Sequence, residues 1–567
     1  MLTKVVLGVS IIFATSSLGS AFPLDENPAK KIRRIDRQVK IIAVPAGPSQ
    51  EVSDAIRTRV LQSAVVLSEL GGKKYRLMSL RYVDNGTSSP TRFRATFYDY
   101  SEDRTLVAQG DLAGKEPIAI HQGAFQPLSN EEEFDEAVAV LRRDAKIAGQ
   151  LDNGILKPFR PMPPTTVLIG TIERLVNVGL GAATSSAHNE IVSVSIKRGE
   201  VIHYDDGAPA TALVAPEACG PPSGGNNGSG SGAAQITTMQ GGSPLWEMLV
   251  QSPTGSSGTN GSGIEIQNVK YKGKLVLKRG HVPVLDVQYA GDACGPYRDW
   301  QDEQNSFDAP AAGATYPNGP TGGIAILADG QIARTILETG NDAGNFKGVA
   351  IYRQNAETVM VTEMTAGWYR YIMEWRFADD GTIRPRFGFG TTSNNCVCFV
   401  HYHHVYWRFD FDIVQPNNKV FQVERGRKFM QPITTEINRN KSIQTTRSIL
   451  IRNSNGNEAY KLVPNVTDGI VDAFGVNDLW VLRYKAPTGN PITSEIDDGR
   501  VCCGGPNQNI AINGWVNGES VVDQDIVVWY GAHFTHTDGA ARLDPDRYAM
   551  VISGEHVVGP DIRPVLW

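Results

Sequence analysis

The sequence lacks an excess of basic residues. Its 567 residues include 54 lysines and arginines against 60 aspartates and glutamates, which gives a formal net charge of -6 at pH 7. A protein that binds nucleic acid needs clustered Lys and Arg to contact the phosphates. The composition therefore predicts no nucleic-acid partner. A chain of this length can bury large cores and should contain about three domains of roughly 150 residues each.

Long apolar runs are also missing. The N-terminal segment MLTKVVLGVSIIFATSSLGSA has Lys4 before a short apolar run and ends in small residues. A membrane anchor would need about 20 apolar residues, whereas a shorter run between a positive charge and small residues is typical of a secretory signal. We therefore expect a signal peptide over residues 1–21, cleavage after Ala21, and a secreted protein that has no membrane partner.

Cysteine and histidine are scarce, with six and ten copies. In an exported protein the cysteines could form up to three disulfides, whose pairing the sequence leaves undetermined. Cys396 and Cys398 could alternatively serve as soft metal ligands. The six positions are Cys219, Cys294, Cys396, Cys398, Cys502 and Cys503.

Two similar units are expected in the first part of the chain. Residues 50–71 have apolar residues at helical spacing and end in a Gly-Gly pair, and strand-like runs follow. The scheme repeats from Ser129, which is predicted to form a capping box with Glu132. We expect two small, cystatin-like α+β domains over residues 40–127 and 128–215.

The texture of the sequence then changes. Residues 216–265 are rich in Gly, Ser and Asn, which predicts a linker or a long loop. Residues 266–567 contain many short strand-like runs and no strong amphipathic helix, which favours one large all-β sandwich. The expected fold class is thus two small α+β domains followed by a large β-sandwich catalytic domain.

The stretch CVCFVHYHHVYWRFDFDI, residues 396–413, concentrates residue types that bind metals. Alternate residues of a strand share a face, so His401 and His403 lie together on the face that carries bulky apolar residues. Such a pair can chelate a transition metal, although two histidines bonded to backbone or carboxylate groups are the competing interpretation. Asp410 and Asp412 share the opposite face, where paired carboxylates suit calcium.

A histidine pair needs a third ligand to make a metal site. Two candidates, His533 and His536, lie in the segment DIVVWYGAHFTHTD. Tyr369 stands in TAGWYRYIMEWRF on an apolar face of a predicted strand, where an ordinary core tyrosine would also be expected. Asp308 stands in a predicted loop, DEQNSFDAP, and its position alone implies no role.

Together these segments resemble the copper amine oxidases, secreted oxidases that contain the tyrosine-derived cofactor topaquinone. The family pattern H-x-H-x-x-x-x-R-L-D-x-D is matched with Phe409 in place of leucine. The matching residues are His401, His403, Arg408, Asp410 and Asp412. The family's third copper ligand follows a D-[LIV]-V-x-W strand at a spacing that corresponds to His536, with His533 as the fallback.

The resemblance also implies roles for other residues. Tyr369 corresponds to the tyrosine converted to topaquinone, Asp308 to the catalytic base, and Tyr297 to the tyrosine that hydrogen-bonds the quinone. A structural calcium ion would be held by the side chains of Asp410, Asp412 and Asp525 and by the carbonyl groups of Phe411 and Ile526.

By the same resemblance the protein would be a homodimer that oxidises primary amines with O2 to aldehyde, ammonia and hydrogen peroxide. Three residues depart from the family pattern: Trp368 and Arg370 flank Tyr369 in place of Asn and Asp or Glu, and Ser306 replaces a tyrosine before Asp308. A catalytically silent, secreted copper-binding protein on the same fold is therefore the alternative function.

Overall fold

The computed structural model describes residues 39–83, 91–123, 126–127, 129–159, 165–168, 170–182, 190–203, 227–228, 232–253, 256, 263–289, 297–298, 305–306, 323–340, 348–366, 369–393, 401–425, 429–441, 447–465, 468–469, 477–484, 515–536, 542–544, 549–551 and 558–567. The expected signal peptide, all six cysteines, Asp308 and Trp368 lie outside these ranges. Within them, no helix has the length and apolar character needed to cross a bilayer.

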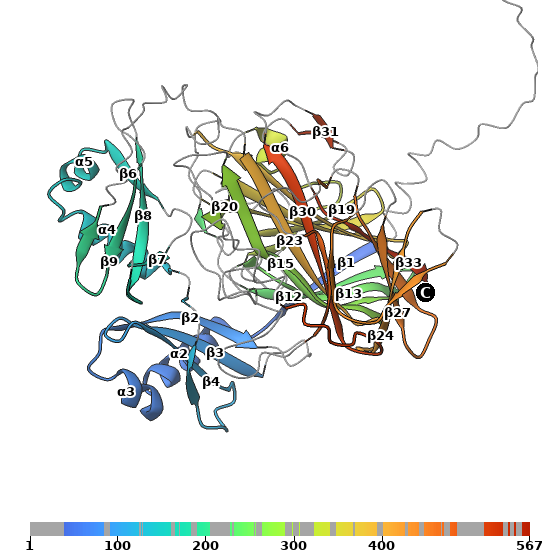
Figure 1. Cartoon of the computed structure of the whole chain (residues 1–567), viewed down its shortest axis with the longest axis horizontal. Helices are drawn as coiled ribbons and strands as arrows, with labels where there is room; N and C mark the ends of the chain where they lie inside the picture. Colours follow the sequence, from blue (N-terminus) through green and yellow to red (C-terminus); the bar gives the residue numbers. More distant parts are fainter. Residues whose placement is uncertain are drawn as a thin grey trace, which may run out of the picture.

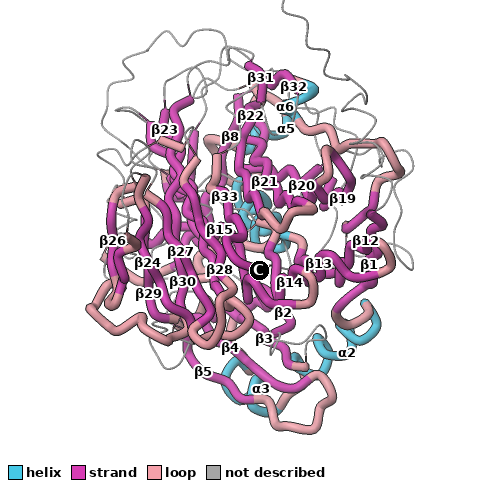
Figure 2. The backbone as a smooth tube through the Cα atoms, turned by 90° about the vertical axis from the view of Figure 1, so that its right-hand side faces the viewer, coloured by secondary structure: helices cyan, strands magenta, loops and turns pink. Residues whose placement is uncertain are grey.

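Two large sheets form the β-sandwich in the second part of the chain (Figures 1 and 2). The described strands of the first sheet are, in spatial order, β1 (Val39–Ala46), β12 (Ala233–Gln240), β13 (Ser243–Gln251), β14 (Glu265–Tyr271), β15 (Lys274–Tyr289), β23 (His401–Phe411), β30 (Ile526–His536), β29 (Leu479–Arg483) and β26 (Ile437–Arg439). A short strand, β16 (Tyr297–Arg298), also pairs with β15.

The second sheet faces the first. Its described strands are, in spatial order, β18 (Ile324–Ile326), β19 (Val349–Gln354), β20 (Glu357–Ala366), β21 (Tyr369–Ala378), β22 (Ile383–Thr391), β33 (Asp561–Leu566), β28 (Ala459–Val463), β27 (Ser448–Asn453), β24 (Asn418–Val423) and β25 (Gln431–Ile433). The ladder between β22 and β33 contains one residue pair, Ile383 with Ile562.

The main hydrophobic core lies between these sheets and follows the alternation of their strands. From β23 it takes every second side chain from Val405 to Phe411, and from β21 every second side chain from Tyr369 to Phe377. All of these are at most 1% exposed. The apolar face predicted for the segment that contains the His-x-His motif therefore does face the interior.

The chain enters the sandwich before it forms the small units. Strand β1 pairs with β12 over eight residues, and β12 and β13 lie inside the predicted linker 216–265 (Figure 1). That prediction was wrong for residues 233–251. The two strands have apolar residues in alternation, but Gly-rich tracts flank them on both sides, and the composition of the whole window concealed them.

The first small unit is a four-stranded sheet with two helices. The predicted helix over residues 50–71 is two helices, because Ser63 begins the second with an extended backbone. A separate hydrophobic core lies between the helices and the sheet. The elements are α2 (Gln50–Leu61), α3 (Ala64–Leu70), β2 (Tyr75–Val83), β3 (Arg92–Asp99), β4 (Arg104–Asp111) and β5 (Ala119–Gly123).

The second small unit repeats the scheme with α4 (Glu131–Leu141), α5 (Ala148–Asp152), β6 (Leu156–Phe159), β7 (Thr165–Val167), β8 (Arg174–Ala182), β9 (Glu190–Ser195) and β10 (Glu200–Ile202). Helix α4 begins one residue later than predicted. Asn130, rather than Ser129, is its N-cap and accepts a 2.9 Å hydrogen bond from the backbone of Glu133. Asn caps a helix as well as Ser does, so the motif alone did not separate the two.

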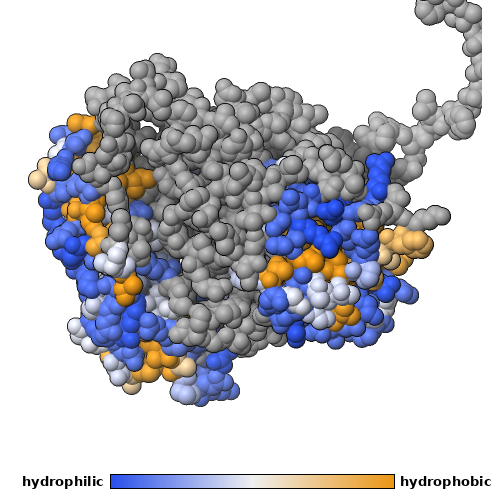
Figure 3. Space-filling view, viewed as in Figure 1, coloured by the Kyte–Doolittle hydropathy of each residue, from blue (hydrophilic) through white to orange (hydrophobic). Residues whose placement is uncertain are grey.

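A buried ion pair of the second small unit is contacted by two tyrosines of the first unit. Arg174 on β8 donates to both carboxylate oxygens of Glu133 at 2.9 and 2.8 Å, and neither side chain is exposed. Tyr100 from the first unit donates to the same carboxylate at 2.6 Å. The arginine also lies over the ring of Tyr98 from the first unit, 5.0 Å from its centre. On the face shown in Figure 3, hydrophilic residues cover most of these units and hydrophobic ones are scattered.

The variant Arg174→Ala should lower the free energy of unfolding by about 3–5 kcal/mol, because it leaves the Glu133 carboxylate buried and unpaired. Arg142→Ala is the matched control, since its ion pair with Asp152 is half exposed and should contribute no more than about 1 kcal/mol. Denaturant unfolding of both variants measures the difference. Equal losses would show that the buried pair contributes no more to stability than an exposed one.

Candidate functional site

A buried tyrosine and a buried histidine meet between the two sheets. Tyr369 begins β21 and is 1% exposed, and His403 on β23 of the facing sheet is fully buried. Their ring centres lie 5.2 Å apart, with ring planes at 84°. Two residues that the motifs singled out independently, 34 positions apart in the sequence, are therefore neighbours.

Aromatic residues surround this pair. Phe389 on β22 stacks on the His403 ring with centres 4.1 Å apart. Tyr371 stacks on Tyr369 at 5.5 Å and also lies 6.0 Å from the histidine ring. The sequence analysis did not single out Phe389, although the alternation of RPRFGFGT marks it as an inward-facing strand position. Among the described residues, Tyr369 and His403 thus pack against the aromatic rings of Tyr371 and Phe389.

The strand register places the other two proposed copper ligands opposite each other. Strands β23 and β30 are antiparallel, and His401 pairs directly with His536. Opposed residues of an antiparallel pair have Cβ atoms about 5 Å apart. His403 lies two positions from His401 on β23. The side chains of His401 and His536 lie outside the described residues, so the register alone places them.

His533, the fallback ligand, lies on the other face of β30. Tyr530 and Ala532 belong to the core between the sheets, whereas Trp529 belongs to a separate cluster on the outer face. By strand alternation, position 536 lies on the face of Tyr530 and position 533 on that of Trp529. His533 is 4% exposed and its Nε2 lies 2.7 Å from Asp478 Oδ1.

His404 joins His533 on this outer face. The two Nδ1 atoms are 2.8 Å apart, and the two residues are a directly opposed pair of β23 and β30. Burial, His533 and the charge of Lys441 together hold the pKa of His404 well below its ordinary value, so its ring is neutral. Strand alternation places His404 on the face opposite to His403, but no local pattern indicates Asp478 or Lys441, which belong to distant segments.

Three carboxylates gather at the other end of β23. One oxygen each of Asp410, Asp412 and Asp525 can be chosen so that all lie within 4.8 Å of one another. Burial raises the pKa of Asp410. Burial and then Asp410 raise the pKa of Asp412 to about 7, and burial, Asp410 and Asp412 raise that of Asp525 to about 8. The carbonyl groups of Phe411 and Ile526 were the other predicted ligands. These two residues are directly opposite each other in the β23–β30 ladder.

Arg370, a departure from the family pattern, does not share the face of the Tyr369 ring. Its neighbours at 369 and 371 both face the core, so alternation places Arg370 on the outer face of β21. The side chain is 2% exposed, and its Nη1 donates to the backbone oxygen of Tyr369 at 3.0 Å. The arginine side chain therefore lies on the face of β21 opposite to the phenol ring.

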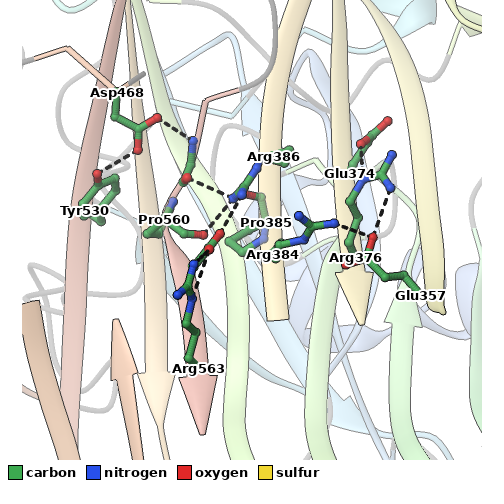
Figure 4. Close-up of polar contacts among 12 residues, drawn as sticks. Glu357, Glu374, Arg376, Arg384, Pro385, Arg386, Asp468, Tyr530, Pro560 and Arg563 are labelled. Carbon is green, nitrogen blue, oxygen red and sulfur yellow. Dashed lines mark hydrogen bonds and ion pairs between the residues drawn. The ribbon is translucent and has the colours of Figure 1, made fainter. Parts of the chain in front are cut away.

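Buried ion pairs on the outer face hold β21 between its neighbours (Figure 4). Arg376 on β21 donates to Glu374 at 3.0 Å and to Glu357 on β20 at 3.3 Å. Arg384 on β22 donates to the same Glu357 carboxylate at 2.6 Å. Arg376, Glu374 and Glu357 are each at most 4% exposed. The strand that carries Tyr369 is thus fixed laterally by charged hydrogen bonds.

A second polar cluster ties β30 to the C-terminal strand β33 (Figure 4). Tyr530 donates to Asp468 at 2.7 Å, and the other oxygen of that carboxylate accepts the backbone N–H of Gly559 at 2.9 Å. Arg386 on β22 donates to the carbonyl of Gly559 at 2.9 Å and to Asp561 at 2.6 Å. These contacts link β22 of one sheet to β30 of the other.

The proposed base and its neighbours are only partly placed. Tyr297 lies on β16 opposite Val287 of β15, and Val287 is in turn opposite His403, so the backbone positions form one row. Ser306 lies on a short strand, β17 (Asn305–Ser306), which pairs with β11 (Asn227–Gly228). Asp308 lies outside the described residues, so its predicted role stays a prediction.

Comparison with known proteins finds no matching family model and no matching curated protein. Solved structures do match. A copper-containing benzylamine oxidase from Hansenula polymorpha has a TM-score of 0.52 at 14% identity, over 83% of this chain and 88% of that one. An amine oxidase from Aspergillus nidulans has a TM-score of 0.52 at 12% identity, over 92% and 88%.

A lysyl oxidase from Pichia pastoris has a TM-score of 0.50 at 12% identity, over 91% of this chain and 88% of that one. Identities this low support similarity of fold rather than of activity. The matches nevertheless cover between 83% and 92% of this chain. The chain therefore has the overall fold of the copper amine oxidases.

Proposed function

We propose that the protein is a secreted, copper-dependent oxidase that converts primary amines and O2 to aldehyde, ammonia and hydrogen peroxide, with Tyr369 as the precursor of topaquinone. The contact between the Tyr369 and His403 rings across the sandwich carries this proposal. It brings the two sequence motifs together inside a fold that copper amine oxidases share. The proposal includes a homodimer, by analogy with the family.

The residues at the site suit a copper ion. His403 and the positions of His401 and His536 supply three imidazoles from two paired strands. Imidazole nitrogen is a preferred ligand of copper, and three histidines leave open coordination positions for exogenous molecules. We propose His536 rather than His533 as the third ligand, because His533 lies on the opposite face of β30 and bonds to His404 and Asp478.

Copper and topaquinone would supply the redox chemistry of amine oxidation, and the protein would bind, orient and exclude water. The packed rings of Tyr371 and Phe389 surround Tyr369 and keep its ring out of solvent. Asp308 is proposed to remove a proton from the substrate's α-carbon as a general base. Tyr297, whose backbone lies in the same cross-strand row as His403, is proposed to hydrogen-bond the cofactor ring.

We further propose calcium at Asp410, Asp412 and Asp525, with the carbonyl groups of Phe411 and Ile526. Burial raises the pKa values of all three carboxyl groups, and neighbouring carboxylates raise those of Asp412 and Asp525 further, so a cation would favour their joint ionisation. Hard oxygen ligands of this kind are those that calcium prefers. A calcium ion here would join β23 to β30 at the end remote from the histidines.

Calcium should stabilise the protein more strongly at alkaline pH. With a chelator present, Asp412 and Asp525 of the folded protein keep protons that the unfolded aspartates lose near pH about 4. The free energy of unfolding should therefore fall as the pH rises through about 7 to 8. Calcium requires deprotonated ligands, so its effect on the melting temperature should grow over that range. Thermal unfolding with calcium and with chelator, near pH about 5 and about 9, measures this.

Asp412→Asn should remove most of this calcium effect. Asp523→Asn is the matched control, because its carboxyl is half exposed, pairs with Lys419 and is not part of the cluster. A calcium effect that is equal in the two variants would rule out a site at these three aspartates.

The proposed function is tested by loading the purified protein with copper in air, staining it for quinone and measuring peroxide release with a panel of primary amines. Staining together with amine-dependent peroxide supports the oxidase. Bound copper without staining would overturn the oxidase proposal in favour of the alternative, a catalytically silent copper-binding protein. That alternative was considered because Trp368 and Arg370 depart from the family pattern.

A further inference from the structure

A buried polar chain runs across three strands on the outer face of the first sheet, directly behind the histidine positions. It begins at His404 on β23, passes to His533 on β30, and ends at Asp478, which immediately precedes β29. The two contacts are 2.8 and 2.7 Å long. All three residues are at most 4% exposed.

The order of hydrogen bonds in this chain is set from the Asp478 end. One carboxylate oxygen accepts the backbone N–H of Lys441 at 2.9 Å, and the Lys441 ammonium lies 3.8 Å from the other. Asp478 thus acts as an acceptor, so His533 donates to it from Nε2. When His533 is neutral, its Nδ1 is an acceptor, and the 2.8 Å contact assigns the donor to His404 Nδ1.

The backbone around His533 leaves little room for another arrangement. A Cβ at Gly531 would lie 3.0 Å from His533 Nε2, and a Cβ at Gly469 would lie 2.5 Å from the His533 backbone oxygen. Gly469 also donates its N–H to that oxygen at 2.7 Å, and Lys441 Nζ donates to the carbonyl of Gly531 at 2.6 Å. The ring of His533 is therefore held by side-chain and backbone contacts together.

Stability alone does not account for such a chain. Buried polar networks are costly to desolvate, and well-packed apolar residues often stabilise a fold as well or better. The outer face already has an apolar cluster that includes Trp480 and Leu482, so buried apolar residues are compatible with this face. The chain also lies next to the proposed copper site. His404 directly follows His403 in the sequence, and it is opposed to His533. His533 in turn lies three residues before His536.

We propose that His404, His533 and Asp478 are positioning residues that fix the separation and rotation of β23 and β30, so that the three inner-face histidine positions are preorganised for a metal ion. The inference rests on the proposed copper site and adds the residues that orient its strands. A bond between opposed outer-face side chains restrains the twist of both strands. The twist of the two strands determines the directions in which the side chains at positions 401, 403 and 536 project from the inner face.

The test compares copper affinity and the electron paramagnetic resonance spectrum of Cu(II) in the full-length protein. His404→Leu should weaken copper binding by about 10–100-fold, the effect typical of outer-shell partners, and should alter the spectrum. His404→Asn, whose amide N–H can replace the Nδ1–H donor, should restore most of both. His533→Gln removes the same contact while keeping a donor toward Asp478, and it serves if His404→Leu does not fold.

Trp480→Phe is the matched control, because it disturbs the same outer-face cluster and leaves the polar chain intact. It should lower stability without changing copper affinity or spectrum. Wild-type affinity and spectrum in folded His404→Leu or His533→Gln would overturn the positioning role and leave a structural one. A wild-type protein that binds no copper would instead overturn the proposed function and this inference together, so the two failures are distinguishable.

Discussion

Replacing Tyr369 with phenylalanine should abolish quinone staining and reduce amine-dependent peroxide release to background, while copper binding persists. Phenylalanine lacks the phenol oxygen from which oxidation of the ring begins, so no cofactor can form. The ring would still fill the same space between Tyr371, Phe389 and His403. The cost in stability should be no more than that of one hydroxyl group, about 1 kcal/mol.

Tyr371→Phe is the control for this prediction. Tyr371 is buried, stacks on Tyr369 and lies within 6.0 Å of His403, but it is not the residue that corresponds to the cofactor. This variant should keep both staining and activity. The assignment would be refuted if Tyr369→Phe stained as strongly as the wild type, and it would move to the neighbouring strand position if Tyr371→Phe alone lost the stain.

The second large effect concerns copper. His536→Ala should reduce copper from a stoichiometric amount to a residual one, because two histidines without a third ligand form a weak and incomplete site. His533→Ala should still bind copper stoichiometrically when copper is in excess, with the weaker affinity expected from the loss of the polar chain. The two variants differ because positions 536 and 533 lie on opposite faces of β30.

Metal analysis and the nitrogen hyperfine pattern of bound Cu(II) separate these outcomes. His533→Ala should keep the pattern of three imidazoles and His536→Ala should not. The reverse result would make His533 the ligand and would require β30 to present its outer face to the metal. His403→Ala should resemble His536→Ala in copper content.

The sequence was sufficient to predict the inner face of β23, since strand alternation is a local property. From it followed the burial of His403 and the apolar row from Val405 to Phe411. It was not sufficient to show that Phe389 stacks on His403, or that β12 and β13 lie between Gly-rich tracts. The first depends on the packing of two sheets, and the second on a pairing with β1 nearly 200 residues away.

The polar chain shows the same limit. His404 was the most conspicuous histidine of the motif after the pair itself, yet its partners come from other strands. His533 and Asp478 are 129 and 74 residues away from it, and no local pattern connects them. The family pattern also could not have indicated them, because it describes the ligands rather than the residues behind them. Only the register of β23, β30 and β29 brings the three together.

The central claim is that Tyr369, in contact with His403, is the precursor of topaquinone. The most direct test is mass spectrometry of the peptide that contains residue 369, before and after copper and O2 are added to the metal-depleted protein. Conversion of the tyrosine to topaquinone adds two oxygen atoms to that residue and removes two hydrogen atoms. We predict this change at residue 369, dependent on copper. An unmodified Tyr369 in protein that has bound copper and been exposed to O2 would contradict the account.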